Sequence, residues 1–422
     1  MSERALSAAA SGAPQTPPPA GRLRSRLPWV LLAVAAGLML LSAVRMITGA
    51  NDLTSGGAIA AMLTAAVPIG LAGLGGLWSE RAGVVNIGLE GMLILGTWGG
   101  AWGTLTFGVW GGVVVGALAG GIGGLLHALA TVTFNVDHIV SGVAITILAG
   151  GVARYLSSFT FATLPGGGVT QSPFLSPLPR LSLPGASNLQ GLEDRHWFLI
   201  SDIAGVLRGL LTNVSALTVI AIALVPITYY VLWRTAFGLR LRSCGENPRA
   251  AETLGVNVYT YKYVAVIISG GLAGLGGAFL SLVASSIYRE GQTGGRGYIG
   301  LATMIFGNWR PGGLAAGAGL FGYTDALQLR GGSDSIHALL LFITVVLVVI
   351  AAYQLRRGHR TVGIASLGIA ALAALWYATT DRLPVEFVQA MPYLVTIVVL
   401  ALASQRLRMP AADGQPYRKG GD

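Results

Sequence analysis

The chain has 422 residues, of which 53% are hydrophobic and only 10% are charged. Soluble globular proteins carry about 25% charged residues, so this composition excludes a soluble enzyme, a disordered protein and a fibrous protein. The net charge of +10 comes from basic residues in short loops between apolar blocks. This placement indicates topology signals and contact with anionic lipid rather than a nucleic-acid partner.

The apolar blocks are each about 20 residues long, the length that a membrane-spanning helix needs. We expect an all-α polytopic bundle, because a helix satisfies its own backbone hydrogen bonds in lipid. The Pro-rich start predicts an uncleaved, disordered cytoplasmic tail at residues 1–27, before a transmembrane domain at 28–405 and a second cytoplasmic tail at 406–422. The full spans, about ten in number, are predicted at 29–49, 56–77, 91–107, 109–133, 138–156, 213–233, 261–286, 336–355, 361–379 and 387–404.

Two loops and one interrupted segment complete the predicted topology. The loop at 157–212 is rich in Pro, Gly and Ser and is expected outside the cell, whereas the charged loop at 234–260 is expected in the cytoplasm. The segment 298–329 is broken at Gly307–Gly313, and we expect two half-spans that enter and leave from the outer side. This path places the arginine-rich loops and both termini in the cytoplasm. Arg45, near the end of the first span, is expected to snorkel to the interface.

The sequence also lacks several kinds of site. The single cysteine, Cys244, excludes an internal disulfide and a cysteine-based metal cluster. The five histidines are scattered, so we expect no metal site. No G-x-x-x-x-G-K-[ST] sequence occurs, which excludes ATP binding by a P-loop. We therefore expect a chain with no catalytic residues and no cofactor of its own.

Polar residues at the junction of the second and third apolar blocks are the first candidates for function. The stretch from Glu80 to Met92 contains two acids, an arginine and Asn86, which lies four residues before Glu90. If this stretch is helical, the spacing places Asn86 and Glu90 on one face of the helix. A carboxylate near membrane depth is costly and indicates a functional site. An interfacial loop whose charges reach water is an equally good interpretation.

The charged loop at 234–260 contains the signals of a short helix. Asn247 suits the N-cap, Pro248 the first turn, and Gly255 the residue at which the helix ends. The predicted helix at 248–254 lies across the cytoplasmic face. It is either a docking element for a cytosolic partner or an ordinary amphipathic interfacial helix.

The broken segment is the third candidate. Interrupted helices in transport proteins often line the substrate route, because unwound backbone is tolerated there. Trp309 and Arg310 would then lie near that route. The alternative is a membrane-embedded turn that only aids packing.

Three stretches carry a resemblance to a known family. They are SERAGVVNIGLEGMLILG at 79–96, GLRLRSCGENPRAAETLGVNVYTYKYVAVIISGGLAGLGGAFLSL at 238–282 and RGYIGLATMIFGNWRPGGLAAGAGLFG at 296–322. In this order they resemble the permease subunits of bacterial ABC importers of the ribose and branched-chain amino-acid type. Within that family they most resemble the branch that carries nucleosides and simple sugars.

The resemblance implies a transport subunit of the bacterial plasma membrane that works by ATP-driven alternating access. A separate cytosolic ATPase would hydrolyse ATP, a second, similar permease would complete the pore, and an external lipoprotein would deliver the substrate. The resemblance places the contact with the ATPase in a coupling loop at Gly245, Glu246, Asn247, Pro248, Arg249, Glu252 and Gly255. A nucleoside needs aromatic stacking and polar contacts, which Asn86, Glu90, Asn308 and Trp309 could supply.

Other functions are weighed against this one. Within the family, the substrate could be a simple sugar such as ribose, or a branched-chain amino acid. A secondary transporter or channel would need ionisable residues buried in mid-span, and only Asp325 and Glu90 qualify. A membrane enzyme would need a cluster of acids or histidines at one interface, which the sequence does not contain.

Overall fold

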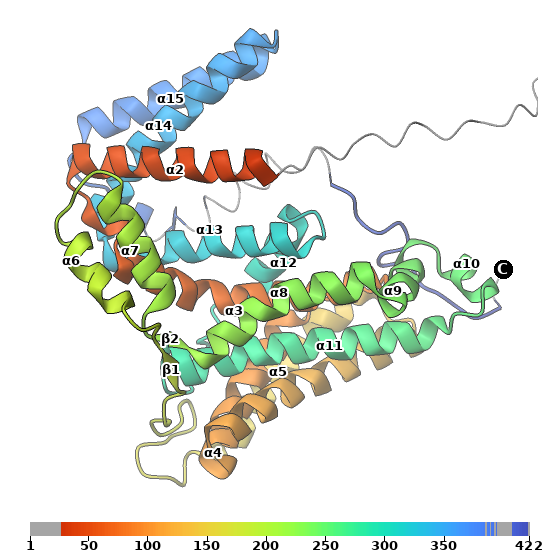
Figure 1. Cartoon of the computed structure of the whole chain (residues 1–422). Helices are drawn as coiled ribbons and strands as arrows, with labels where there is room; N and C mark the ends of the chain where they lie inside the picture. The colour runs from red at the N-terminus through yellow and green to blue at the C-terminus, as the bar shows by residue number, and fades with distance from the viewer. Residues whose placement is uncertain (1–26, 385, 389, 392–393, 395–406, 421–422) are drawn as a thin grey trace, which may run out of the picture.

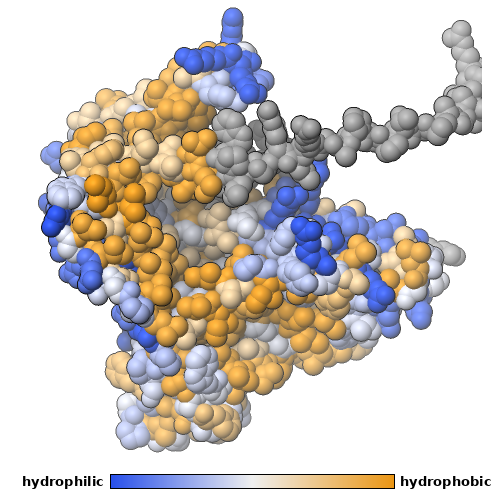
Figure 2. Space-filling model, viewed as in Figure 1, coloured by the Kyte–Doolittle hydropathy of each residue, from blue (hydrophilic) through white to orange (hydrophobic). Residues whose placement is uncertain are grey.

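The structure is a computed structural model that describes residues 27–384, 386–388, 390–391, 394 and 407–420. Helices dominate these residues, and eight of the helices are long and apolar enough to cross a membrane. This confirms the predicted all-α polytopic fold. Figure 2 shows apolar side chains over the sides of the bundle and hydrophilic side chains mostly towards its ends. Such a distribution suits a protein that is surrounded by lipid.

The long helices follow the predicted spans. They are α2 (Leu27–Thr48), α3 (Gly56–Arg81), α4 (Leu89–Ala128), α5 (His138–Thr160), α8 (Ala216–Arg234), α11 (Val258–Phe279), α14 (Gly332–Arg356) and α15 (Arg360–Thr379). Single π-helical turns at Leu129–Thr133 and Leu280–Ala284 extend α4 and α11. The last predicted span, at 387–404, lies mostly outside the described residues.

Helix α4 is two spans rather than one. Gly108 has φ 80° and ψ 176°, which no α-helix contains, and the helix reverses there. Gly99 consequently faces Ala119, and Gly103 faces Gly112. Residues 20 apart would be about 30 Å apart in a straight helix, so these contacts require the two arms to run antiparallel. The structure therefore contains two antiparallel helical arms on either side of Gly108, at the positions predicted for the spans 91–107 and 109–133.

Helix α3 runs the length of the bundle. We therefore name the two ends of the bundle after the first and last residues of α3. The Gly56 end carries the start of α3, and the Arg81 end carries its last residue. Figure 1 shows α6, α7, β1 and β2 at the Gly56 end, and α9, α10 and the C-terminus at the Arg81 end. The arginines within α9 and at the end of α3 share the Arg81 end, as the predicted topology requires. These basic residues thus lie on one side of the bundle, which we expect to be the cytoplasmic side.

The core is built on close glycine contacts between α11 and both arms of α4. At Gly274 of α11, an added Cβ would collide with the backbone of Gly116 and Gly120. Small residues of this kind let membrane helices approach closely, because lipid gives no hydrophobic drive for their association. Large side chains then fill the space beside this contact, including the fully buried Leu74, Leu77 and Phe279.

The predicted outer loop at 157–212 is not a plain coil. It contains β1 (Arg180–Leu181), η3 (Ala186–Leu189), α6 (Gln190–Glu193) and α7 (Ile200–Leu211), and β1 pairs antiparallel with β2 (Val214–Ser215). Gly209 of α7 packs on Gly56 and Ile59 of α3. The loop therefore covers the Gly56 end of the bundle.

The broken segment forms α12 (Arg296–Phe306) and α13 (Pro311–Arg330). Gly300 of α12 packs on Ile69 and Ala72, near the middle of α3, so α12 is a half-span as predicted. Helix α13 has 20 residues and packs along α3 from Gly73 to Gly57, so it is longer than the predicted second half-span, although it is not among the eight helices that are long and apolar enough to cross a membrane. The reason is the position of the turn, which lies at the Arg81 end and not halfway along the bundle.

Candidate functional site

The predicted coupling loop folds into two short helices, α9 (Ala236–Glu246) and α10 (Pro248–Thr253). The Asn247 side chain caps α10 by accepting a hydrogen bond from the Ala250 amide at 3.0 Å. Gly255 has φ +82°, a conformation that favours glycine and ends the helix. The local signals read from the sequence are thus confirmed. Helix α9 is a further element, and its N-cap is Thr235, which accepts from the Gly238 amide at 3.1 Å.

Helix α9 is packed firmly against the end of α3. Cys244 is fully buried, and burial raises the pKa of its thiol to about 11. Gly245 sits directly on the backbone of Arg81, and Glu246 forms an ion pair with Arg81 at 3.7 Å. In contrast, Arg249 and Leu254 at α10 are exposed, and Leu254 is 84% exposed. Helix α9 is therefore packed against the bundle, whereas α10 is exposed to solvent.

Arg81 also holds the turn between α12 and α13. Its guanidinium donates to the Trp309 carbonyl at 2.7 Å, and the Trp309 indole donates to the Glu80 carboxyl at 2.6 Å. Asn308 and Trp309 both have positive φ, 54° and 51°, so the turn is held in a backbone conformation that such residues rarely adopt. The Asn308 carboxamide oxygen accepts from the Arg408 amide at 2.7 Å. These contacts connect the α12–α13 turn to the end of α3 and to the C-terminal segment at Arg408.

Asn86 and Glu90 lie deeper in the bundle. Asn86 is fully buried and donates to the Ser269 hydroxyl at 2.9 Å. Glu90 is 5% exposed and accepts hydrogen bonds from the Gly295 and Gly297 amides at 2.9 and 2.7 Å. These amides lie at the start of α12, where a negative charge is stabilised by the helix dipole. Glu90 therefore fixes the beginning of the half-span.

The four predicted pathway residues do not form one cluster. Asn86 and Glu90 belong to the interior, whereas Asn308 and Trp309 belong to the Arg81 end, beside the coupling loop. Their contact with a substrate stays a prediction. The Asn86 carboxamide oxygen is buried and makes no hydrogen bond among the described residues.

A groove along α3 was missed from the sequence. Two adjoining cavities of about 260 Å³ and 220 Å³ lie along α3 between Gly57 and Leu74, with Leu63 common to both. The cavity nearer the Gly56 end has polar walls that include Thr64, Asn213 and Thr218. The deeper one is apolar and lies between α3, α8 and α13. The only signal in the sequence is the run of small residues from Gly56 to Gly70, which is common in membrane helices for packing alone.

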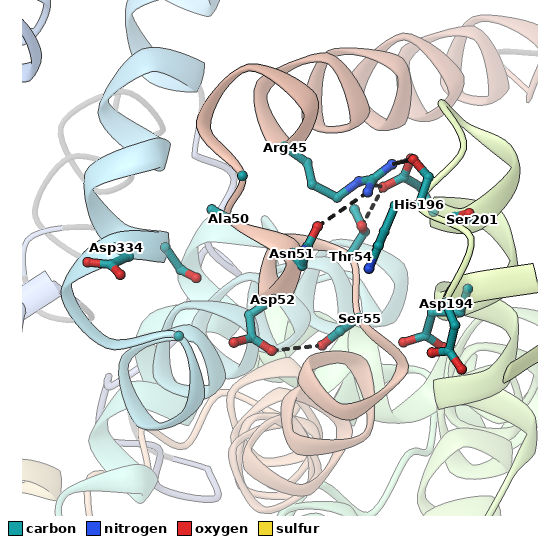
Figure 3. Close-up of a pocket in the computed structure, with 15 residues that line it drawn as sticks. Arg45, Ala50, Asn51, Asp52, Thr54, Ser55, Asp194, His196, Ser201 and Asp334 are labelled. Atoms are coloured by element: carbon teal, nitrogen blue, oxygen red, sulfur yellow. Dashed lines mark hydrogen bonds and ion pairs between the residues drawn. The ribbon is translucent and has the colours of Figure 1, made fainter.

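A polar pocket of about 360 Å³ opens at the Gly56 end (Figure 3). Its floor is the buried ion pair between Arg45 and Asp202, at 2.7 Å. Ser42 and Thr54 also donate to the Asp202 carboxylate. Arg45 is 3% exposed, so the prediction that it snorkels is wrong. Asp202 lies 157 residues further along the chain, and no local pattern could indicate the pairing.

Comparison with known proteins gives consistent matches. A family model described as "Branched-chain amino acid transport system / permease component" matches residues 58–352, which is more than half of the chain. The nucleoside ABC transporter permease protein NupC of Lactococcus lactis is 32% identical over 86% of this chain and 96% of its own length. The guanosine ABC transporter permease protein NupQ of Bacillus subtilis is 31% identical over the same shares.

A third relative is named for another substrate. A putative glucose ABC transporter permease protein of Haloferax volcanii is 37% identical over 66% of this chain and 79% of its own length. No solved structure gives a significant match to the chain.

Proposed function

Because the chain belongs to the branched-chain amino acid transport system permease family, we propose that it is the membrane permease subunit of an ABC importer for nucleosides. The observation that carries the substrate class is the similarity to the nucleoside and guanosine permeases, each over 86% of the chain. The substrate would cross the plasma membrane through this multi-pass protein, and no covalent chemistry is assigned to the chain.

The proposed partners are a cytosolic ATPase, a second permease and an external lipoprotein receptor. The ATPase is required because the sequence has no P-loop, and the exposed α10 offers it a contact. The second permease would close the groove along α3, which is open on one side of a single chain. The receptor would deliver the substrate at the Gly56 end.

The contacts at the Arg81 end suggest how ATP binding would move the groove. A displacement of α10 passes through Asn247 to α9, which rests on the backbone of Arg81. Arg81 in turn holds the Trp309 carbonyl, at the turn where α13 begins. Helices α3 and α13 form two walls of the deeper cavity. A push on α10 would therefore change the width of the groove through directly packed elements.

The groove supplies the two kinds of surface that a nucleoside needs. Its apolar half could accept the face of a base, and the hydroxyls of Thr64, Ser215 and Thr218 at its mouth could bind ribose. Asn86, Glu90, Asn308 and Trp309 stay proposed pathway residues. If Asn86→Ala and Trp309→Ala both fold and transport with unchanged kinetics, these residues do not contact the substrate.

A simple sugar is the second candidate substrate, and the glucose-named relative is the observation that favours it. This relative has a higher sequence identity than the nucleoside-named relatives, but its alignment covers only two-thirds of this chain. The nucleoside-named relatives cover more of the chain, which is why the nucleoside is preferred.

The test is uptake of labelled uridine, adenosine and ribose by cells that lack the chain and by cells in which it is restored. We expect the deletion to abolish nucleoside uptake, with rescue by the wild type but not by Glu246→Ala combined with Arg249→Ala. Loss of ribose uptake alone would move the substrate to sugars. Unchanged uptake of all three would contradict the proposed function.

A further inference from the structure

The C-terminal residues 407–420 lie along the coupling loop. The Ala411 amide donates to the Glu246 carboxylate at 3.3 Å, and the Ala412 amide donates to the Gly245 carbonyl at 2.9 Å. The Tyr417 hydroxyl donates to the Glu252 carboxylate at 2.6 Å. Two of the acids that were predicted to face the ATPase are thus engaged by this chain's own tail.

The tail has an inner and an outer side. Ala412, Asp413 and Tyr417 are buried against the bundle, whereas Gln415 and Arg418 are exposed. The Tyr417 ring also packs on Tyr259 of α11, with the ring centroids 5.5 Å apart. These buried residues, together with the backbone hydrogen bonds, hold the tail against the bundle and leave its other side chains facing outward.

An open cavity of about 550 Å³ lies between the tail and the start of α10 and is lined by residues of both. Its lining includes Arg249 on α10, opposite Gln415 and Arg418 on the tail. Glu246 also lines the cavity, but its carboxylate is already paired with Arg81 and the Ala411 amide. The charge left for a partner is therefore positive, which favours an acidic side chain.

We propose that residues 407–420 and α10 together form the surface that receives the cytosolic ATPase, with an acidic side chain of that subunit between Arg249 and Arg418. This inference rests on the proposed function and adds the tail to it. Family membership does not imply the tail, because the matching family model ends at residue 352.

An inhibitory tail is the other arrangement to test. Such a tail would cover the exposed face of α10, yet Arg249, Ala250 and Leu254 remain exposed beside it. The tail borders α10 and enlarges its surface, so the structure favours a shared docking surface.

The first test is nucleoside uptake by charge-reversal variants in intact cells. Arg418→Glu should lower uptake about tenfold, as expected when an interface charge is reversed, at an unchanged amount of protein in the membrane. Arg356→Glu is the matched control, since Arg356 is an exposed arginine at the end of α14, and it should transport normally. Increased uptake by Arg418→Glu, or by a chain that ends at residue 406, would indicate an inhibitory tail. Wild-type uptake by Arg418→Glu would overturn the inference.

Photo-crosslinking in native membranes separates this inference from the proposed function. Gln415→p-benzoylphenylalanine and Leu254→p-benzoylphenylalanine should each crosslink to a subunit that labelled azido-ATP also marks, whereas the same change at Arg356 should not. A crosslink from position 254 without one from 415 would overturn the role of the tail and keep the ATPase contact at α10. No azido-ATP-labelled product from either position would contradict the ATPase contact itself.

Discussion

The charged side chains described below differ in exposure between the two ends of the bundle. At the Gly56 end, Arg45 and Asp202 form an ion pair whose side chains are 3% and 0% exposed, and Arg208 pairs with Glu193 at 2.5 Å. At the Arg81 end, Glu246 is 54% exposed in its longer pair with Arg81, and Arg249 and Arg418 face solvent. The Gly56 end thus contains a buried ion pair that is satisfied within the chain, whereas Arg249 and Arg418 at the Arg81 end remain exposed to a partner.

Asp202→Asn should have the largest effect if the Gly56 end depends on this buried pair. The change leaves the Arg45 guanidinium buried without its counter-ion, which typically costs about 3–5 kcal/mol in the free energy of unfolding. Unfolding of the purified protein in detergent measures it. Glu290→Gln is the control, because the exposed pair of Glu290 with Arg154 should contribute about 0–1 kcal/mol. Equal stability of the two variants would show that the Gly56 end does not depend on the buried pair.

Gly274→Ala should destabilise the middle of the bundle by about 1–3 kcal/mol, the usual cost of overpacking. The added methyl group would collide with the backbone of Gly116 and Gly120. Both glycines belong to α4, so the collision can be relieved only by moving that helix. Gly271→Ala is a matched control on the same helix, since its nearest neighbour, the Ala117 carbonyl oxygen, is 3.6 Å away. Similar unfolding of both variants in detergent would mean that α4 and α11 tolerate separation.

Docking of the tail should depend on pH, in contrast to the Gly56 end. Burial raises the pKa of Asp413 from 3.8 to about 7, in a site that also contains Glu80 and Arg81 of α3 and Lys262 of α11. The docked carboxyl binds its proton more tightly, so docking is favoured at low pH and is weakened as pH rises through about 7. The docking equilibrium should therefore be smaller at pH 8 than at pH 6.

Hydrogen exchange of residues 407–420, corrected for the intrinsic effect of pH, measures this change. Asp413→Asn cannot titrate and should reduce the pH dependence. A wild-type tail with the same protection at pH 6 and pH 8 would contradict the assignment to Asp413.

Tyr417→Phe should have the smallest effect. It removes the hydrogen bond to Glu252 but keeps the ring on Tyr259, and a bond of this kind contributes about 1 kcal/mol. Exchange should increase in the tail and in α10, with no change in α7. Faster exchange at α7 would show that the two ends are coupled more strongly than their separate contacts indicate.

Features that depend on local sequence were the predictable ones. Hydropathy located the spans, because each span must cover the apolar core of the bilayer. The signals at Asn247, Pro248 and Gly255 located α10, because caps and helix ends are set by neighbouring residues.

Contacts between residues far apart in the sequence could not be predicted from local sequence patterns. The Arg45–Asp202 pair, the groove along α3 and the docked tail each join elements far apart in the chain. The position of Trp309 was misjudged because a broken helix suggests a break at mid-membrane, whereas this turn lies at the Arg81 end. The sequence did show Asn86 and Glu90 as unusual, but not that Glu90 binds the start of α12.

Competition for uptake tests the central claim most directly. Uptake of labelled uridine would be measured in cells that express the wild-type chain, with excess unlabelled guanosine, glucose or leucine added in separate experiments. The account predicts that guanosine suppresses uptake and that glucose and leucine do not. Suppression by glucose or leucine, with none by guanosine, would contradict a nucleoside permease.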